Sequence, residues 1–439
     1  MNRFEQPTKN DRVQETLSSH ARPIITSVYT ADPAATAMPD GKLYIYPSRD
    51  MDPARGCDRM DRYHVYSTKD MAHFTDEGEI LRADSVSWGR PEGGFMWAPD
   101  CKQGKDGRFY YYYPHPSDSN WNDSWKIGVA VSKTPYGPFE DLGYIEGIGG
   151  WCMIDPSIFL DDDGEIYLYF GGGAMPRAVK LEDDMMTVKD GKVYELEGLE
   201  DFHEASYLFK REGIYYMTYS DNVEGRNRMH YATSPSPLGP FEHRGVYLEY
   251  TGCDTSHGSV VFYRDHWFCF YHNCALSGRG NLRSVCVDEL FFEKDGSIRV
   301  VSQTKEEKEP MFGEKKWDVS GLPFVSPDLA IREEDRAMIE KKGAVIEPGK
   351  SLTFTKVDGR DGGRVSIHFE YETKVLSHLR LWVGDTDWSF INLSPDRQMT
   401  SFTVPLQKGK TNTLSLTFAD GEGYFKGFYL EYLGQLPTT

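Results

Sequence analysis

Apolar strands alternate with short polar turns through the first three hundred residues. Residues 30–46, 153–170 and 202–219 each contain a strand, a turn with glycine, and a returning strand rich in tyrosine. Residues 106–113 and 264–271 have the same turn and aromatic strand. Small sheets repeated at intervals of roughly 50 to 65 residues are typical of propeller blades. The pattern therefore predicts a β-propeller, in which we count five blades.

The pattern changes after about residue 301. A charged connector at residues 305–310 opens a stretch with little periodicity, and cleanly alternating strands follow from residue 343. Five such strands within about a hundred residues are typical of a β-sandwich. We therefore predict an all-β protein with a propeller at residues 1–304, a linker at 305–342 and a β-sandwich at 343–439.

Composition narrows the possible partners. The chain has 439 residues and a formal net charge of −19, which disfavours nucleic acids and anionic membranes as partners. No apolar run is long enough to span a bilayer, and residues 1–28 lack the layout of a secretory signal. A cytoplasmic location is expected, although a chain with its signal removed would look the same. The seven cysteines form no CxxC pair. The oligomeric state is left open.

Three carboxylates occupy equivalent positions in the repeat. Asp32, Asp155 and Glu204 each stand at the start of a first strand, and such starts converge near the axis of a propeller. Any one of them could simply cap a turn, but three in register favour chemistry. Two carboxyl groups that act on water and on a leaving oxygen perform inverting glycoside hydrolysis, and a third raises the pKa of the acid. Loops 56–61, 84–100 and 114–125 are expected to wall the pocket.

The segments around these carboxylates resemble glycoside hydrolase family 43 over residues 25–301. The motifs are Ala31-Asp32-Pro33, Ile154-Asp155-Pro156-Ser157, His203-Glu204-Ala205-Ser206-Tyr207 and Met96-Trp97-Ala98-Pro99-Asp100. The resemblance implies a five-bladed propeller in which Asp32 is the general base, Glu204 the general acid and Asp155 the modulator of the acid. It also implies that Trp97 lines the substrate pocket. Ser206 stands where the family often has proline.

Two further site residues follow from the same resemblance. The segment around His257 resembles the one whose histidine lies on the propeller axis, often beside calcium or water. Calcium prefers oxygen ligands, so we interpret His257 as filling the axis first and as a metal ligand second. No cofactor is expected to be required, and a structural calcium ion is possible. Arg283 resembles the arginine that reaches the sugar and a catalytic carboxylate; the alternative is a surface charge at a strand edge.

The C-terminal sandwich resembles a family 6 carbohydrate-binding module. Sugar binding there would need exposed aromatic side chains, for which Trp382, Trp388 and Tyr424 are the candidates. The alternative is that the domain only supports the propeller.

The resemblance implies an inverting glycosidase that releases α-L-arabinofuranose from oligosaccharides derived from plant polysaccharides. A β-D-xylosidase, or an enzyme with both activities, is the near alternative, since the two sugars present similar hydroxyl groups. A retaining β-fructosidase is disfavoured because its Trp-Met-Asn-Asp-Pro-Asn motif is absent around Asp32. A sugar-binding propeller without turnover is the alternative from another class.

Overall fold

The computed structural model describes residues 21–51, 57–253, 255–306, 311–312, 319–330, 339–340 and 342–435. Residues 1–20, Gly56 and much of the charged connector lie outside this part of the chain. The all-β prediction is confirmed. Within the described residues the helical segments are short 3₁₀ turns: η3 (Cys57–Arg59), η4 (Ala83–Ser85), η5 (Trp121–Asp123) and η6 (Pro327–Leu329). None of the helices in these residues is long and apolar enough to cross a membrane.

Five small antiparallel sheets follow one another between residues 30 and 289. The first contains β1 (Thr30–Ala37), β2 (Leu43–Arg49), β3 (Arg62–Thr68) and β4 (Thr75–Arg82). The second contains β5 (Asp100–Gln103), β6 (Phe109–Pro116), β7 (Trp125–Ser132) and β8 (Glu140–Tyr144). The third contains β9 (Ser157–Leu160), β10 (Ile166–Phe170), β11 (Arg177–Leu181) and β12 (Val188–Glu195). The fourth contains β13 (Glu204–Arg211), β14 (Ile214–Ser220), β15 (Met229–Ser234) and β16 (Glu242–Leu248), and the fifth β17 (Gly258–Tyr263), β18 (His266–Asn273) and β19 (Ser284–Glu289).

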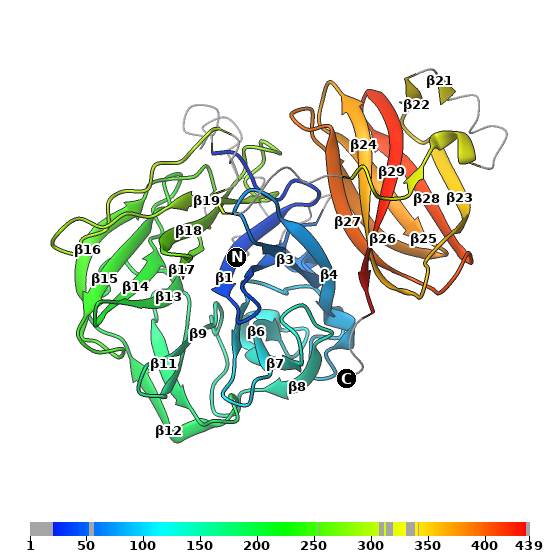
Figure 1. Cartoon of the computed structure of the whole chain (residues 1–439). Coiled ribbons are helices and arrows are strands. Elements are labelled where there is room, and N and C mark those ends of the chain that lie inside the picture. Colours follow the sequence, from blue (N-terminus) through cyan, green and yellow to red (C-terminus); the bar gives the residue numbers. More distant parts are fainter. Residues whose placement is uncertain are drawn as a thin grey trace.

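The first strands of these sheets form a closed ring. Strand β1 contacts β5, β5 contacts β9, β9 contacts β13, β13 contacts β17, and β17 returns to β1. Figure 1 shows β1, β9, β13 and β17 around the middle of this domain. Side chains tie neighbouring first strands together, since Thr36 Oγ1 donates to the Cys101 carbonyl at 3.0 Å and Ile158 N–H donates to Asp100 at 2.9 Å. The ring is the arrangement of a β-propeller, and it brings the starts of these strands to one place.

Tyrosine-rich strands fill the space between the sheets. Successive side chains of a strand point to opposite faces, so Tyr110 and Tyr112 of β6 enter one hydrophobic cluster and Tyr111 and Tyr113 enter another. The first cluster joins the second and third sheets, and the other joins the first and second. The aromatic run therefore packs on both faces of the second sheet.

The C-terminal domain is made of two sheets packed face to face. One contains β20 (Phe324–Val325), β21 (Ile339–Glu340), β22 (Gly343–Ile346), β24 (Gly363–Thr373), β27 (Met399–Leu406) and β29 (Gly423–Gly434). The other contains β23 (Ser351–Val357), β25 (Ser377–Val383), β26 (Thr386–Leu393) and β28 (Asn412–Asp420). Two short strands of the first sheet, β20 and β21, fall in the stretch for which the sequence analysis predicted a linker.

The sandwich lies against the first sheet of the propeller. Strand β27 contacts β4, and Figure 1 shows the sandwich beside β3 and β4. One hydrophobic cluster runs from Ile45 and Phe270 of the propeller to Phe402 and Phe428 of the sandwich. The two domains therefore share a core.

Candidate active site

The three carboxylates predicted from the repeat lie at the same end of their sheets, on irregular backbone. Asp32 has φ 50° at a bulge between Ala31 and Ala34 of β1. Asp155 has φ 55° two residues before β9, and Glu204 opens β13 beside a second bulge. Positive φ is unfavourable for residues other than glycine, and such strain and bulges gather at functional sites, where they redirect side chains.

Asp32 is buried and forms hydrogen bonds with three groups, two through its carboxylate and one through its backbone. Ser48 Oγ donates to its Oδ2 at 2.5 Å, Arg283 Nη1 donates to its Oδ1 at 2.9 Å, and its backbone N–H donates to His272 Nδ1 at 3.0 Å. Burial alone would raise the pKa of Asp32, but Arg283 first, then His272 and His257, and last the bond from Ser48 together lower the pKa below its usual value. Asp32 is therefore ionised at neutral pH.

Arg283 is buried, which contradicts the alternative that it is a surface charge. Its Nε and Nη2 donate to the two oxygens of Asp50 at 3.0 and 2.9 Å, and its backbone N–H donates to Asp50 at 2.7 Å. The same guanidinium reaches Asp32 through Nη1. Burial opposes the charge, but Asp32 and Asp50 outweigh it and raise the pKa of Arg283. A fork of this kind fixes the direction of the guanidinium as well as its charge.

Asp155 and Glu204 have the opposite electrostatic environment. Burial, the Glu204 carboxylate and Asp32 raise the pKa of Asp155 well above its usual value. Burial and the Asp32 charge also raise the pKa of Glu204. The backbone N–H of Ala205, next to Glu204, donates to Asp155 Oδ2 at 2.9 Å, so the third and fourth sheets are joined at this point. Like charges that share a buried site retain a proton between them.

Two histidines complete the buried surroundings of the carboxylates. His257 Nδ1 lies 3.8 Å from Asp155 Oδ2, and burial lowers the pKa of His257 to about 4. Burial and Arg283 lower the pKa of His272 to about 3. Because His272 Nδ1 accepts the Asp32 N–H, its proton is on Nε2. Both rings are therefore neutral at physiological pH.

Among the described residues, these side chains do not provide a set of ligands for calcium. Within the described residues no group of three histidine, cysteine, aspartate or glutamate side chains could hold a metal ion. A single ring nitrogen is a poor ligand for calcium, which prefers six to eight oxygens. The metal role of His257 stays a prediction, and the chemistry proposed below rests on the carboxylates and Arg283.

Aromatic side chains lie around this group. Trp97 packs on Trp125 with ring centroids 4.5 Å apart, and its carbonyl accepts the Tyr63 hydroxyl at 2.6 Å. Burial, Asp32 and Asp155 raise the pKa of Tyr63, which places the phenol close to both carboxylates. Trp97 is thus linked to the site through its backbone.

A second tryptophan is more exposed. Trp151 is 46% exposed and precedes Cys152, whose pKa is raised to about 11 by burial and by the charges of Glu204 and Asp155. A side chain at Gly173 would lie 2.4 Å from the Trp151 ring. Glycine there lets the indole rest on the loop that follows β10, next to Gly172, where a side chain would lie 3.7 Å from Glu204.

Comparison with known proteins agrees with this geometry. Residues 21–298 match the family model described as glycosyl hydrolases family 43. The chain belongs to this family. A xylosidase/arabinosidase 43A of Humicola insolens is 35% identical, with 63% of this chain and 98% of the relative covered.

Solved structures show the same likeness. A family 43 β-xylosidase/α-arabinofuranosidase from a compost metagenome, in complex with xylotriose, is 34% identical with a TM-score of 0.59, over 66% of this chain and 99% of that one. An arabinoxylan arabinofuranohydrolase of Bacillus subtilis, in complex with cellotetraose, covers 94% of this chain and 99% of its own at 22% identity and a TM-score of 0.56. That second likeness concerns the fold alone. The family 43 chain is therefore a glycosidase.

The structure of this family 43 glycosidase brings together most of the residues predicted as its site. Asp32, Asp155, Glu204, Arg283 and His257 are in electrostatic contact, although their parts in the reaction stay predictions. The sequence analysis did not identify the supporting groups, which are Ser48, Asp50, Tyr63 and Trp151. Ser48 and Asp50 follow an apolar strand as polar residues, and this was the available signal.

The aromatic candidates of the sandwich are each half-buried. Trp382 lies under the Arg380 guanidinium at 4.8 Å, and Lys342 lies 5.5 Å from the Tyr424 ring. The Trp388 carbonyl accepts a hydrogen bond from Arg62 of the propeller at 3.2 Å. The likeness to a carbohydrate-binding module stays a prediction.

Proposed function

We propose that this protein is an inverting glycosidase that removes a terminal or branching pentose from oligosaccharides derived from xylan. The observation that carries the proposal is the opposite shift of two carboxyl groups, one buried and one half-buried. The pKa of Asp32 is lowered, whereas that of Glu204 is raised. Two carboxyl groups with pKa values driven apart are suited to act as a base and an acid at the same pH.

Asp32 is the general base of this proposal. Arg283 and Ser48 keep it ionised, so it can accept a proton from water. The two bonds also fix the carboxylate, because both of its oxygens are engaged by groups that are themselves buried. A fixed base holds the attacking water in one place relative to the sugar.

Glu204 is the general acid. Asp155 accepts the Ala205 backbone N–H at 2.9 Å, and His203 Nε2 lies 3.6 Å from Glu204 Oε2. Burial raises the pKa of both carboxyl groups, and the Glu204 charge also raises that of Asp155, so the pair holds a proton in common. In the reaction Glu204 passes this proton to the glycosidic oxygen.

The reaction is a single displacement. Water loses a proton to Asp32 as its oxygen bonds to the anomeric carbon, and the bond to the leaving oxygen breaks as Glu204 protonates that oxygen. The attack and the departure occur on opposite faces of the sugar, so the configuration inverts. Arg283 donates to Asp32 and is placed to donate to a sugar hydroxyl as well.

The pentose is proposed from two supports. The relative from Humicola insolens and the compost enzyme carry names that join xylosidase and arabinosidase or arabinofuranosidase activities. Trp151 offers an exposed ring beside the acid, where the sugar of the leaving group would lie. We propose α-L-arabinofuranose as the leading substrate unit, and β-D-xylose as a second one that the same site accepts.

The test combines stereochemistry with leaving groups. Proton NMR of the wild-type reaction on aryl arabinofuranoside and xyloside should show the inverted anomer first; a retained anomer contradicts the mechanism. Glu204→Gln should lose activity on xylobiose but keep much of it on a dinitrophenyl pentoside, whose leaving group needs no acid. Asp32→Asn should lose both. A wild-type protein that binds pentosides without releasing product would instead be a sugar-binding propeller.

A further inference from the structure

The end of strand β2 faces two parts of the molecule. Ser48 donates to Asp32, and Asp50 holds Arg283 through three hydrogen bonds. Arg49 lies between them in sequence, and side chains alternate along a strand. It therefore points away from the carboxylates, where Nη2 donates to Ser389 Oγ of the sandwich.

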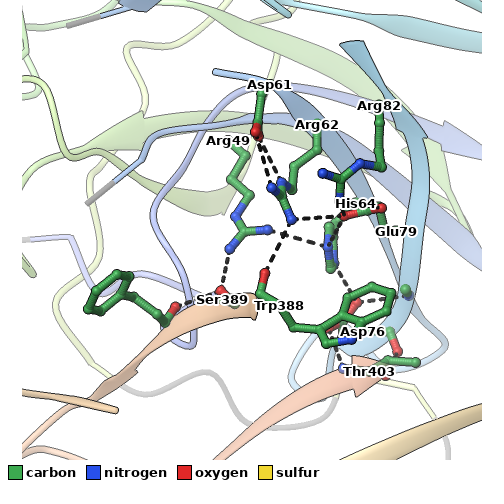
Figure 2. Close-up of polar contacts among 12 residues, drawn as sticks. Arg49, Asp61, Arg62, His64, Asp76, Glu79, Arg82, Trp388, Ser389 and Thr403 are labelled. Carbon is green, nitrogen blue, oxygen red and sulfur yellow. Dashed lines mark hydrogen bonds and ion pairs between the residues drawn. The ribbon is translucent and has the colours of Figure 1, made fainter. Parts of the chain in front are cut away.

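Arg49 is buried in the contact between the domains, at 4% exposure. Its guanidinium carbon lies 5.7 Å from the centre of the Phe402 ring in β27, and Nη1 lies 3.5 Å from His64 Nε2. Figure 2 shows the side chain extending to Ser389, with His64 on its other side. The contacts with Ser389 and Phe402 depend on the position of the sandwich, and the contact with His64 depends on β3.

The charge of Arg49 is not balanced by a direct partner. In the described part of the chain it forms no ion pair with a carboxylate, and burial and the neighbouring Arg62 lower its pKa. Asp61 and Glu79 are bonded to Arg62 instead. An unpaired buried charge is costly, so Arg49 does not lie here for the stability of the contact alone.

Other bonds hold the sandwich to the first sheet without reaching the active site. Arg62 donates to the Trp388 carbonyl at 3.2 Å, and Asp76 accepts the Thr403 N–H at 2.9 Å. Arg364 of β24 is equally buried, donates to Glu77 at 2.7 Å and lies 4.1 Å from the Tyr136 ring. Of these interface groups, Arg49 is the one whose chain neighbours hold Asp32 and Arg283.

We propose that Arg49 is a positioning residue for the general base, and that Ser389 and Phe402 make the sandwich part of the support of the active site. Fixing Arg49 fixes the backbone on either side of it, and thereby the hydroxyl of Ser48 and the carboxylate of Asp50. The proposal rests on the proposed function, since it assigns Asp32 as base. The sandwich then acts in catalysis whether or not it binds sugar.

The consequence to measure is the ionisation of Asp32. Besides Arg283, the titratable groups that influence Asp32 or respond to its charge come from several elements: His272 of β18, His257 before β17, Asp155 before β9, Glu204 of β13 and Tyr63 of β3. None of them has a described bond to Arg49. The shortest route along the chain from Arg49 to Asp32 runs through Ser48 and Asp50.

The experiment compares three variants of the full chain on an aryl pentoside. Arg49→Met removes the positioning contact, Ser389→Ala removes only its hydroxyl partner, and Arg364→Met is the control that removes a buried interface arginine elsewhere. Each is assayed for kcat and KM from pH 3 to 8, and for Tm. We expect Arg49→Met to lower kcat at least tenfold with KM within threefold, and to move the acid limb of kcat/KM up by about one pH unit. Ser389→Ala should move the limb in the same direction by less.

Arg364→Met should lower Tm while its acid limb and kcat stay those of the wild type. The proposal is overturned if Arg49→Met and Ser389→Ala keep the wild-type limb, or if Arg364→Met moves it equally. If Arg49→Met does not fold, Ser389→Ala against Arg364→Met decides the question alone. A wild-type enzyme that is inactive on every pentoside refutes the proposed function and this role with it, whereas an active wild type with unmoved limbs refutes this role alone.

Discussion

Replacing Ser48 by alanine tests how the base is kept ionised. The Ser48 hydroxyl donates to Asp32 Oδ2 at 2.5 Å in a buried site. A hydrogen bond to a charged group contributes about 1.5–3 kcal/mol, and one pKa unit corresponds to about 1.4 kcal/mol. Its loss should therefore raise the pKa of Asp32 by about one to two units, while the bond from Arg283 remains.

The sign of the effect on activity follows directly. The bond stabilises the ionised form of Asp32, so the alanine variant needs a higher pH to ionise the base. The acid limb of kcat/KM, which reports groups of the free enzyme, should move upward by the same one to two units. Activity on the alkaline side of that limb should fall less, because the base is ionised there in both proteins.

Ser259 provides a matched control. Ser259 is also buried and lies next to β1, the strand that carries Asp32. Its hydroxyl, however, donates to the Pro33 carbonyl at 2.7 Å and accepts the Ala35 N–H at 3.0 Å. Ser259→Ala therefore removes a buried hydroxyl without removing a bond to the carboxylate. An unmoved acid limb in Ser48→Ala, or an equal shift in Ser259→Ala, would refute the reasoning.

Two further predictions concern the acid side of the site. Asp155→Asn should raise Tm at pH 7.5 and less so at pH 4. The folded pKa of Asp155 is raised, so its cost to stability grows as pH rises from the unfolded pKa towards the folded one. An equal or lower Tm at both pH values in thermal unfolding would contradict this. Trp151→Ala should raise KM for a xylo- or arabino-oligosaccharide about tenfold, as expected from roughly 1.4 kcal/mol of lost ring contact. Phe262→Ala, at an exposed ring packed on Trp267, is the control and should leave KM unchanged. A KM that Trp151→Ala does not change would contradict a role of the Trp151 ring in binding the sugar.

The carboxylates could be found from sequence because the repeat itself carries their geometry. Asp32 and Glu204 stand at matching points of two hairpins, and first strands that form a ring must bring such points together. The tyrosine-rich runs likewise predicted the returning strands. What the pattern could not give is the bulge at Asp32, because its positive φ is imposed by the contacts of the folded ring.

The groups that support the carboxylates could not be predicted from the sequence, for a different reason. Ser48 and Asp50 follow an apolar strand as ordinary polar residues, and nothing local tells a hydroxyl bonded to a carboxylate from one bonded to water. Arg49 and Ser389 are 340 residues apart. Such a pair is set by the docking of two domains, for which neither local propensity nor periodicity carries a signal.

The arrangement also bears on why the sandwich remains attached to the propeller. A ring of sheets can bring carboxylates together without help. The ionisation of Asp32, however, depends on hydrogen bonds that need accurate distances, and the end of β2 supplies one of them from Ser48. Strand ends are the least constrained parts of a sheet. Burying Arg49 under β26 and β27 constrains this end from the side opposite the substrate, where no sugar competes for space. A sandwich that served only to bind polysaccharide would have no need of a buried arginine of the propeller, without a carboxylate partner, at the contact between the two domains.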